Sequence, residues 1–68
     1  MHPVKAYRIL HGLTLRDVSA RGGPHFTIIG RIENGLKPRR EQVEKIARGL
    51  RVRPENLERA IRLSLVEG

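Results

Sequence analysis

The chain has 68 residues and no cysteine, so it can form one small domain that is held together by packing and not by disulfide bonds. Its 14 lysine and arginine residues outnumber 7 aspartate and glutamate residues, and the net charge of +7 indicates a polyanionic partner, either nucleic acid or an anionic membrane surface. No apolar run approaches the ~20 residues of a membrane span, and the N-terminal residues lack the apolar region of a signal peptide, so a cytoplasmic protein is expected.

A first helix is predicted over residues 3–11. Proline suits a first helical turn, and Pro3 stands at the start of this segment. Val4, Tyr7 and Leu10 then form an apolar stripe at helical spacing, which predicts a face that packs against the core. Gly12 ends the helix, as glycine commonly does just past a helix C-terminus.

A second helix is predicted to begin after Thr14, whose hydroxyl is a good N-cap. Asp17 stands near the positive end of the dipole of this helix. The segment 21–24 reads Arg-Gly-Gly-Pro, and no helix can continue through it. We expect a positive φ at Gly23, with Ser19 as the small residue where the next helix crosses closely. Two short helices joined by such a turn are typical of the helix-turn-helix motif.

Three further helices are predicted at 26–34, at 39–49 and from Pro54 onward. In the last two, apolar residues recur three or four positions apart, as expected for faces that pack in a core. These positions are Val43, Ile46, Ala47 and Leu50 in one helix and Leu57, Ile61 and Leu65 in the other. The sequence therefore predicts an all-α fold of five helices in a single domain, residues 1–68.

One register of residues runs through the central part of the chain, from about residue 7 to residue 57. It consists of Gly12-Leu13-Thr14, Ser19, Gly23, Ile32-Glu33-Asn34-Gly35, Lys37-Pro38, Ile46-Ala47, Leu50 and Val52. This register resembles the lambda-repressor-like family of helix-turn-helix proteins, the phage repressor and Cro type. The resemblance implies a compact five-helix domain that binds double-stranded DNA, and we expect a transcriptional repressor that occupies an operator.

The resemblance implies that the third helix reads bases in the major groove. The family's base-contacting positions correspond to Phe26, Thr27, Ile28 and Arg31. Arg31 can bind guanine through two hydrogen bonds, and Thr27 or Ile28 can contact a thymine methyl group. Phe26 has two interpretations, a DNA contact or packing that holds the turn in place. Gly30 either permits a close approach of DNA or of a neighbouring helix, or is simply tolerated in the helix.

Basic residues on both sides of the third helix are candidates for phosphate contacts. Many relatives have glutamine at the position of Leu15, so that contact is missing here, and Arg16 beside it could substitute. His25 occupies the usual position of a serine or threonine N-cap, and because histidine caps less well it is a candidate for a phosphate contact instead. Three more cations surround the N-terminus of the fourth helix, whose free amide groups favour an anion. They are Lys37, Arg39 and Arg40.

The resemblance also implies a structural ion pair between Arg8 and Glu33. If that pair is partly buried, loss of one partner costs ~3 kcal/mol or more, whereas two solvated charges contribute under ~1 kcal/mol. Leu63 and Val66 lie off the apolar stripe of the last helix. They are either a dimer contact or ordinary exposed apolar residues.

No pattern in the sequence indicates catalysis, a cofactor or a metal site. The chain has no cysteine and no glycine-rich phosphate loop after a strand, and its histidines have no carboxylate or cysteine at ligand spacing. Two other functions stay open. An antitoxin or adaptor would bind a protein, such as a toxin, through Phe26, Ile28 and the last helix. A charge-driven binder would hold nucleic acid or anionic membranes without sequence preference.

Overall fold

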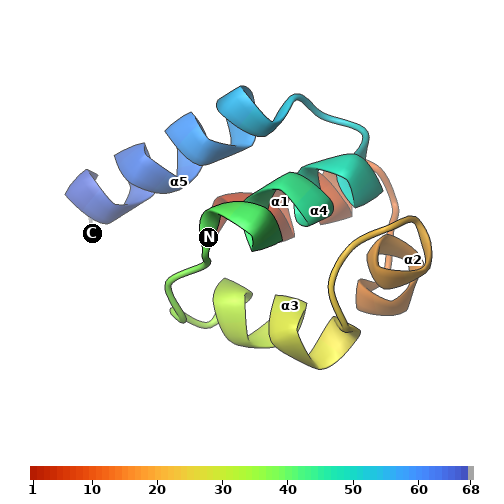
Figure 1. Ribbon diagram of the computed structural model, residues 1–68. Helices are drawn as coiled ribbons and strands as arrows, with labels where there is room; N and C mark the ends of the chain where they lie inside the picture. Colours follow the sequence, from red (N-terminus) through yellow and green to blue (C-terminus); the bar gives the residue numbers. More distant parts are fainter. Residues whose placement is uncertain (68) are drawn as a thin grey trace.

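The computed structural model describes the backbone of residues 1–67 and the side chains of residues 1–64. Over these residues the chain forms five helices and no strand, so the predicted all-α fold is confirmed. The helices are α1 (Pro3–Leu10), α2 (Leu15–Ala20), α3 (Phe26–Glu33), α4 (Arg40–Leu50) and α5 (Pro54–Glu67). Figure 1 shows α4 in the middle of the fold, with α5 on one side of it, α3 on the other and α2 near its C-terminal end.

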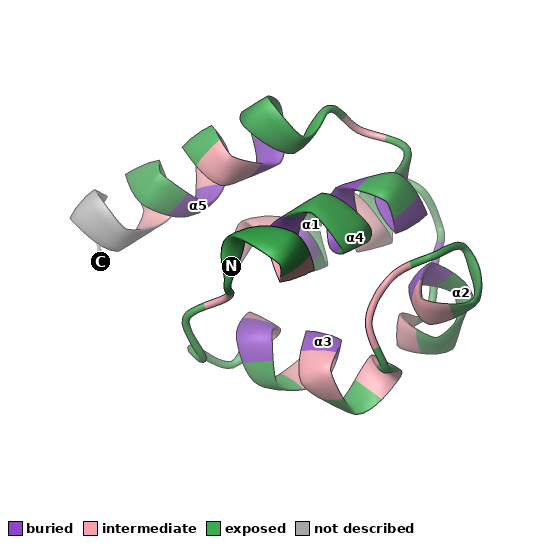
Figure 2. Ribbon diagram, in the orientation of Figure 1, coloured by how far each residue is buried: buried purple, intermediate pink, exposed green. Residues whose placement is uncertain are grey.

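All five helices contribute to one apolar core. Figure 2 shows the buried positions of α3 and α5 on the sides that face α4. The core side chains are Val4, Leu13, Val18, Ile29, Ile32, Val43, Ile46, Ala47, Leu50, Leu57 and Ile61. The stripes predicted for the last two helices are therefore confirmed through Ile61, and Leu65 lies outside the residues whose side chains are described.

The prediction for α1 was wrong at its last position. Val4 is fully buried and Tyr7 packs against the core, but Leu10 remains 77% exposed. Leu10 lies in the last turn of α1, at the edge of an apolar hollow that Ala60 of α5 also lines. Helical spacing identified the face of α1 correctly, but it could not show how far along that face the neighbouring helix extends.

The turn between α2 and α3 uses its two glycines differently from the prediction. Gly22, and not Gly23, has the positive φ, at +110°. The N–H groups of Gly22 and Gly23 donate to the carbonyls of Ser19 and Val18 over 3.3 and 3.0 Å, which closes the C-terminus of α2. Gly23 is required for a different reason, because a Cβ atom there would lie 2.8 Å from the Val18 carbonyl oxygen.

Helices α2 and α4 cross closely at Gly49. A Cβ atom at Gly49 of α4 would lie 2.6 Å from the carbonyl oxygen of Val18 and 2.8 Å from its Cγ1 atom. This contact fixes α4 directly against the middle of α2. The sequence predicts a close crossing beside Ser19 but does not indicate Gly49, because a single glycine near a helix end gives no periodic signal.

Candidate nucleic-acid interface

The first helix of the turn motif is capped as the sequence predicted. The Thr14 hydroxyl accepts the N–H of Asp17 over 3.1 Å, and the Asp17 carboxylate accepts the N–H of Thr14 over 2.9 Å. These two bonds form a reciprocal capping box. The Thr14 backbone N–H, assisted by its hydroxyl, lowers the pKa of the Asp17 carboxyl below its ordinary value. The start of α2 is thus fixed by its own residues.

We expected histidine to be a weaker N-cap than serine or threonine, and His25 nevertheless caps α3. Its Nδ1 atom accepts the N–H of Thr27 over 3.2 Å and lies 2.8 Å from the Thr27 hydroxyl oxygen. An Nδ1 atom that accepts a hydrogen bond carries no proton, so the hydrogen of the neutral ring lies on Nε2. The atom of His25 that remains for another partner is therefore Nε2.

Phe26 packs at the junction of α2 and α3. Its ring stacks on the His25 ring, with 4.4 Å between centroids and 27° between planes. The guanidinium carbon of Arg16 lies 4.8 Å from the Phe26 centroid. This contact between Arg16 and Phe26 is not predictable from local sequence patterns, because the two residues belong to different helices. The one feature of the sequence that indicates such a contact is the position of Arg16 in the first turn of α2, where the helix dipole disfavours a cation.

The outward face of α3 carries Thr27 and Arg31, and both are exposed. Ile29 and Ile32 point into the core, and Ile28 packs partly against it. Among the described residues, no carboxylate or carbonyl accepts a hydrogen bond from the Arg31 guanidinium. The central arginine of this face is thus available to a partner.

A second basic group surrounds the N-terminus of α4. It consists of Lys37, Arg39 and Arg40, all of them exposed. The N–H of Arg39 donates to Gln42 Oε1 over 2.8 Å, and no side chain caps the first amide groups of the helix. Arg40 pairs with Glu44 at 3.3 Å, an exposed pair of the kind that contributes little stability. The predicted phosphate-contact residues therefore form two groups, one at each end of α3.

A partly buried ion pair holds α3 against α1. The Arg8 guanidinium donates two hydrogen bonds to the Glu33 carboxylate, over 2.8 and 3.0 Å, and a third to the Leu13 carbonyl over 3.0 Å. The two side chains are only 15% and 7% exposed, and the bond to Glu33 raises the pKa of the Arg8 guanidinium. The pair expected from the sequence is present, and it connects the end of α3 to the segment that leads into α2.

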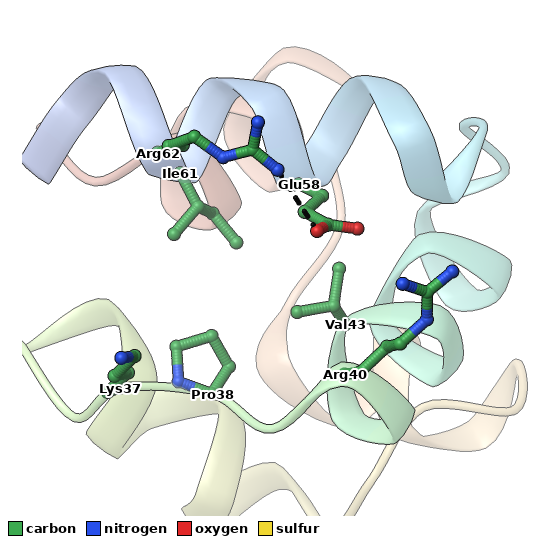
Figure 3. A pocket seen from close by; sticks show the side chains of 7 residues that line it. All are labelled: Lys37, Pro38, Arg40, Val43, Glu58, Ile61 and Arg62. Carbon is green, nitrogen blue, oxygen red and sulfur yellow. Dashed lines mark hydrogen bonds and ion pairs between the residues drawn. The ribbon is translucent and has the colours of Figure 1, made fainter.

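A groove of about 310 Å³ runs between the start of α4 and α5. Figure 3 shows Pro38 and Val43 on one wall, facing Ile61 across the gap, with Arg62 turned toward Glu58. Arg62 and Glu58 pair at 3.2 Å, so the charges of that wall are satisfied within the protein. The groove lies beside the basic group at the α4 N-terminus. Because Glu58 and Arg62 pair with each other, the exposed surface of α3 remains the candidate interface.

Comparison with known proteins agrees with this geometry. A helix-turn-helix family model matches residues 4–57. The chain belongs to the lambda-repressor-like helix-turn-helix family. Membership in this family makes it a DNA-binding helix-turn-helix regulator. No curated protein and no solved structure matches the chain.

The family match contains every predicted base-contact and phosphate-contact residue but ends before the predicted dimer contact. Leu63 of α5 is 55% exposed, and Val66 lies outside the residues whose side chains are described. Within residues 1–67, none of the helices combines the length and the apolar character that a membrane span requires.

Proposed function

We propose that this helix-turn-helix protein is a cytoplasmic repressor that reads an operator by placing α3 in the major groove of double-stranded DNA. The observation that carries the proposal is the exposed Arg31 in the last turn of α3, with basic residues at both ends of the helix. Within the described residues, its guanidinium forms no ion pair. A helix fits the major groove with its N-terminal residues toward the base edges. Occupation of the operator would then block transcription.

The proposed mechanism separates specificity from affinity. Thr27 and Arg31 read base edges, while Phe26 and Ile28 present apolar surface at the margin of the same face. Phosphate contacts position the helix and supply most of the salt-dependent affinity. The residues assigned to phosphate are Arg16, His25, Lys37, Arg39 and Arg40.

Selection of bound duplexes from a random pool tests this function. We expect enrichment of a defined DNA sequence that contains guanine, the base that arginine contacts most often. A dimer would enrich a pseudo-palindrome with half-sites about 34 Å apart, as expected for paired helix-turn-helix units. Recovery of an unchanged random pool would show binding by charge alone and contradict the proposal.

An adaptor or antitoxin function is the alternative, and one observation favours it. An apolar hollow of about 280 Å³ between α1 and α5 is lined by Pro3, Ala6, Tyr7, Leu10 and Ala60. Exposed apolar surface of this kind is common at protein contacts. Co-purification of a protein partner, together with DNA binding that is absent or insensitive to salt, would favour the alternative.

A further inference from the structure

We infer that Phe26 is a positioning residue, whose ring holds the Arg16 guanidinium at the leading end of α3 so that Arg16 contacts a DNA phosphate. The inference rests on the proposed function. In this inference Phe26 does not contact a base. It supports the phosphate contact that Arg16 of α2 makes.

The Phe26 ring has two basic neighbours from two different elements. Arg16 in α2 places its guanidinium carbon 4.8 Å from the ring centroid, and His25, the N-cap of α3, stacks on the ring at 4.4 Å. A cation within about 6 Å of an aromatic centroid is attracted by the negative π face. The ring thus attracts Arg16 toward α3.

Arg16 has no comparable support from its own helix. The carboxylate beside it, Asp17, accepts the backbone N–H of Thr14 over 2.9 Å. Within the described side chains, no acidic group forms an ion pair with Arg16. A contact through the π face leaves the N–H donors of the guanidinium unused, and these donors match a phosphate well. Arg16 is therefore oriented by the ring but not neutralised by it.

The same ring constrains His25. Nδ1 of His25 is occupied by Thr27, which donates its N–H over 3.2 Å. Stacking on Phe26 restricts rotation of the His25 imidazole about its hydrogen bond to Thr27. The Nε2 atom of His25 therefore points in a defined direction. One aromatic side chain thus orients two of the five residues assigned to phosphate, and these two lie at the N-terminal end of α3, where base reading begins.

A double-mutant cycle on DNA affinity tests the inference. The variants are Arg16→Ala, Phe26→Leu and their combination, measured on a selected duplex over a range of salt concentrations. Phe26→Leu keeps an apolar side chain and removes the π face. Each single variant should lose about two- to fivefold in affinity. Arg16→Ala should also reduce the salt slope by about 0.9. The double variant should lose less than the sum of the two single losses, because part of the Phe26→Leu loss acts through Arg16.

Two control variants sharpen the cycle. Phe26→Tyr keeps the ring and should bind DNA as the wild type does. Arg21→Ala removes a cation from the other end of α2 and should leave the salt slope unchanged. Additive losses in the cycle, or equal losses in Phe26→Tyr and Phe26→Leu, would overturn the inference.

A measurement on the free protein separates this inference from the proposed function. The Phe26 ring current should shift the Cδ protons of Arg16 upfield in the NMR spectrum, and the shift should vanish in Phe26→Leu. Absence of the shift in the wild type would overturn the inference, even if Phe26→Leu proved unable to fold. A wild type that shows the shift but binds no duplex would instead contradict the proposed function.

Discussion

Arg51 adopts a left-handed backbone conformation that usually belongs to glycine. It follows the last residue of α4 with φ +60°, and the N–H groups of Arg51 and Val52 donate to the carbonyls of Arg48 and Ala47 over 3.2 and 3.0 Å. Gly22 has the equivalent position after α2. For a residue with a side chain this conformation costs about 1–2 kcal/mol, so α4 ends in a strained residue.

Arg51→Gly is expected to raise the free energy of unfolding by about 1 kcal/mol, because the strain disappears while the two hydrogen bonds remain. Urea denaturation followed by circular dichroism measures the change. Arg51→Ala is the matched control, since it removes the same charge but keeps Cβ, and it should give no gain. A similar gain in both variants would assign the effect to charge and not to backbone strain.

At the scale of the helices, what the sequence could predict depends on the range of the interaction. The stripe from Val43 to Leu50 was predictable because it repeats within one helix, and the Thr14 cap was predictable because it is local. Gly49 and the Arg16–Phe26 contact were not, because each depends on how two helices lie against one another. The Arg8–Glu33 pair also joins two helices, across 25 positions of the sequence, and it was predicted only through the family resemblance.

The two helical glycines should respond to alanine in opposite directions. A Cβ atom at Gly30 would meet only the Leu15 Cδ1 atom, at 3.6 Å, which is an ordinary contact. Gly30→Ala should therefore stabilise the protein by up to about 1 kcal/mol. Gly49→Ala places Cβ 2.6 Å from the Val18 carbonyl oxygen and should destabilise it by about 1–3 kcal/mol. Thermal denaturation compares them, and a loss of stability in both variants would contradict this account of Gly30.

The Arg8–Glu33 pair should be needed for the α1–α3 contact. Arg8→Ala is expected to destabilise the protein by about 3 kcal/mol, because it leaves the Glu33 carboxylate buried without its partner. Arg62→Ala breaks the exposed pair with Glu58 and is the control, with an expected loss below about 1 kcal/mol. Denaturant titration distinguishes the two, and equal small losses would mean that the Arg8–Glu33 pair is effectively solvated.

At the scale of the whole molecule, acid should destabilise the fold in two stages. Burial lowers the pKa of His2 below its ordinary 6.5, and hydrogen bonds from Thr14 lower the pKa of Asp17 below 3.8. Because the unfolded chain binds these protons more tightly, stability falls as pH drops below 6.5 and falls again below 3.8. His2→Asn keeps a capping side chain and should remove the first stage, and Asp17→Asn should remove the second. Unchanged pH profiles of unfolding in both variants would contradict these assignments.

The charge of the molecule also shows why sequence reading alone left three functions open. A net charge of +7 attracts any polyanion, and charge alone does not distinguish an operator from random DNA or an anionic surface. The structure adds the arrangement of these charges, with Arg31 on the exposed face of α3 between two basic groups and, over residues 1–64, in no ion pair. We therefore propose that specific reading depends on Arg31 and that general affinity depends on the flanking cations.

The ratio of affinities for a selected duplex and a random duplex, compared between Arg31→Ala and Arg39→Ala, tests this division most directly. Arg31→Ala should reduce the ratio by about five- to 150-fold, because a bidentate guanine contact contributes about 1–3 kcal/mol of discrimination. Arg39→Ala should weaken both duplexes alike, keep the ratio, and reduce the salt slope by about 0.9. Equal losses on both duplexes for Arg31→Ala would contradict the claim that α3 reads the operator.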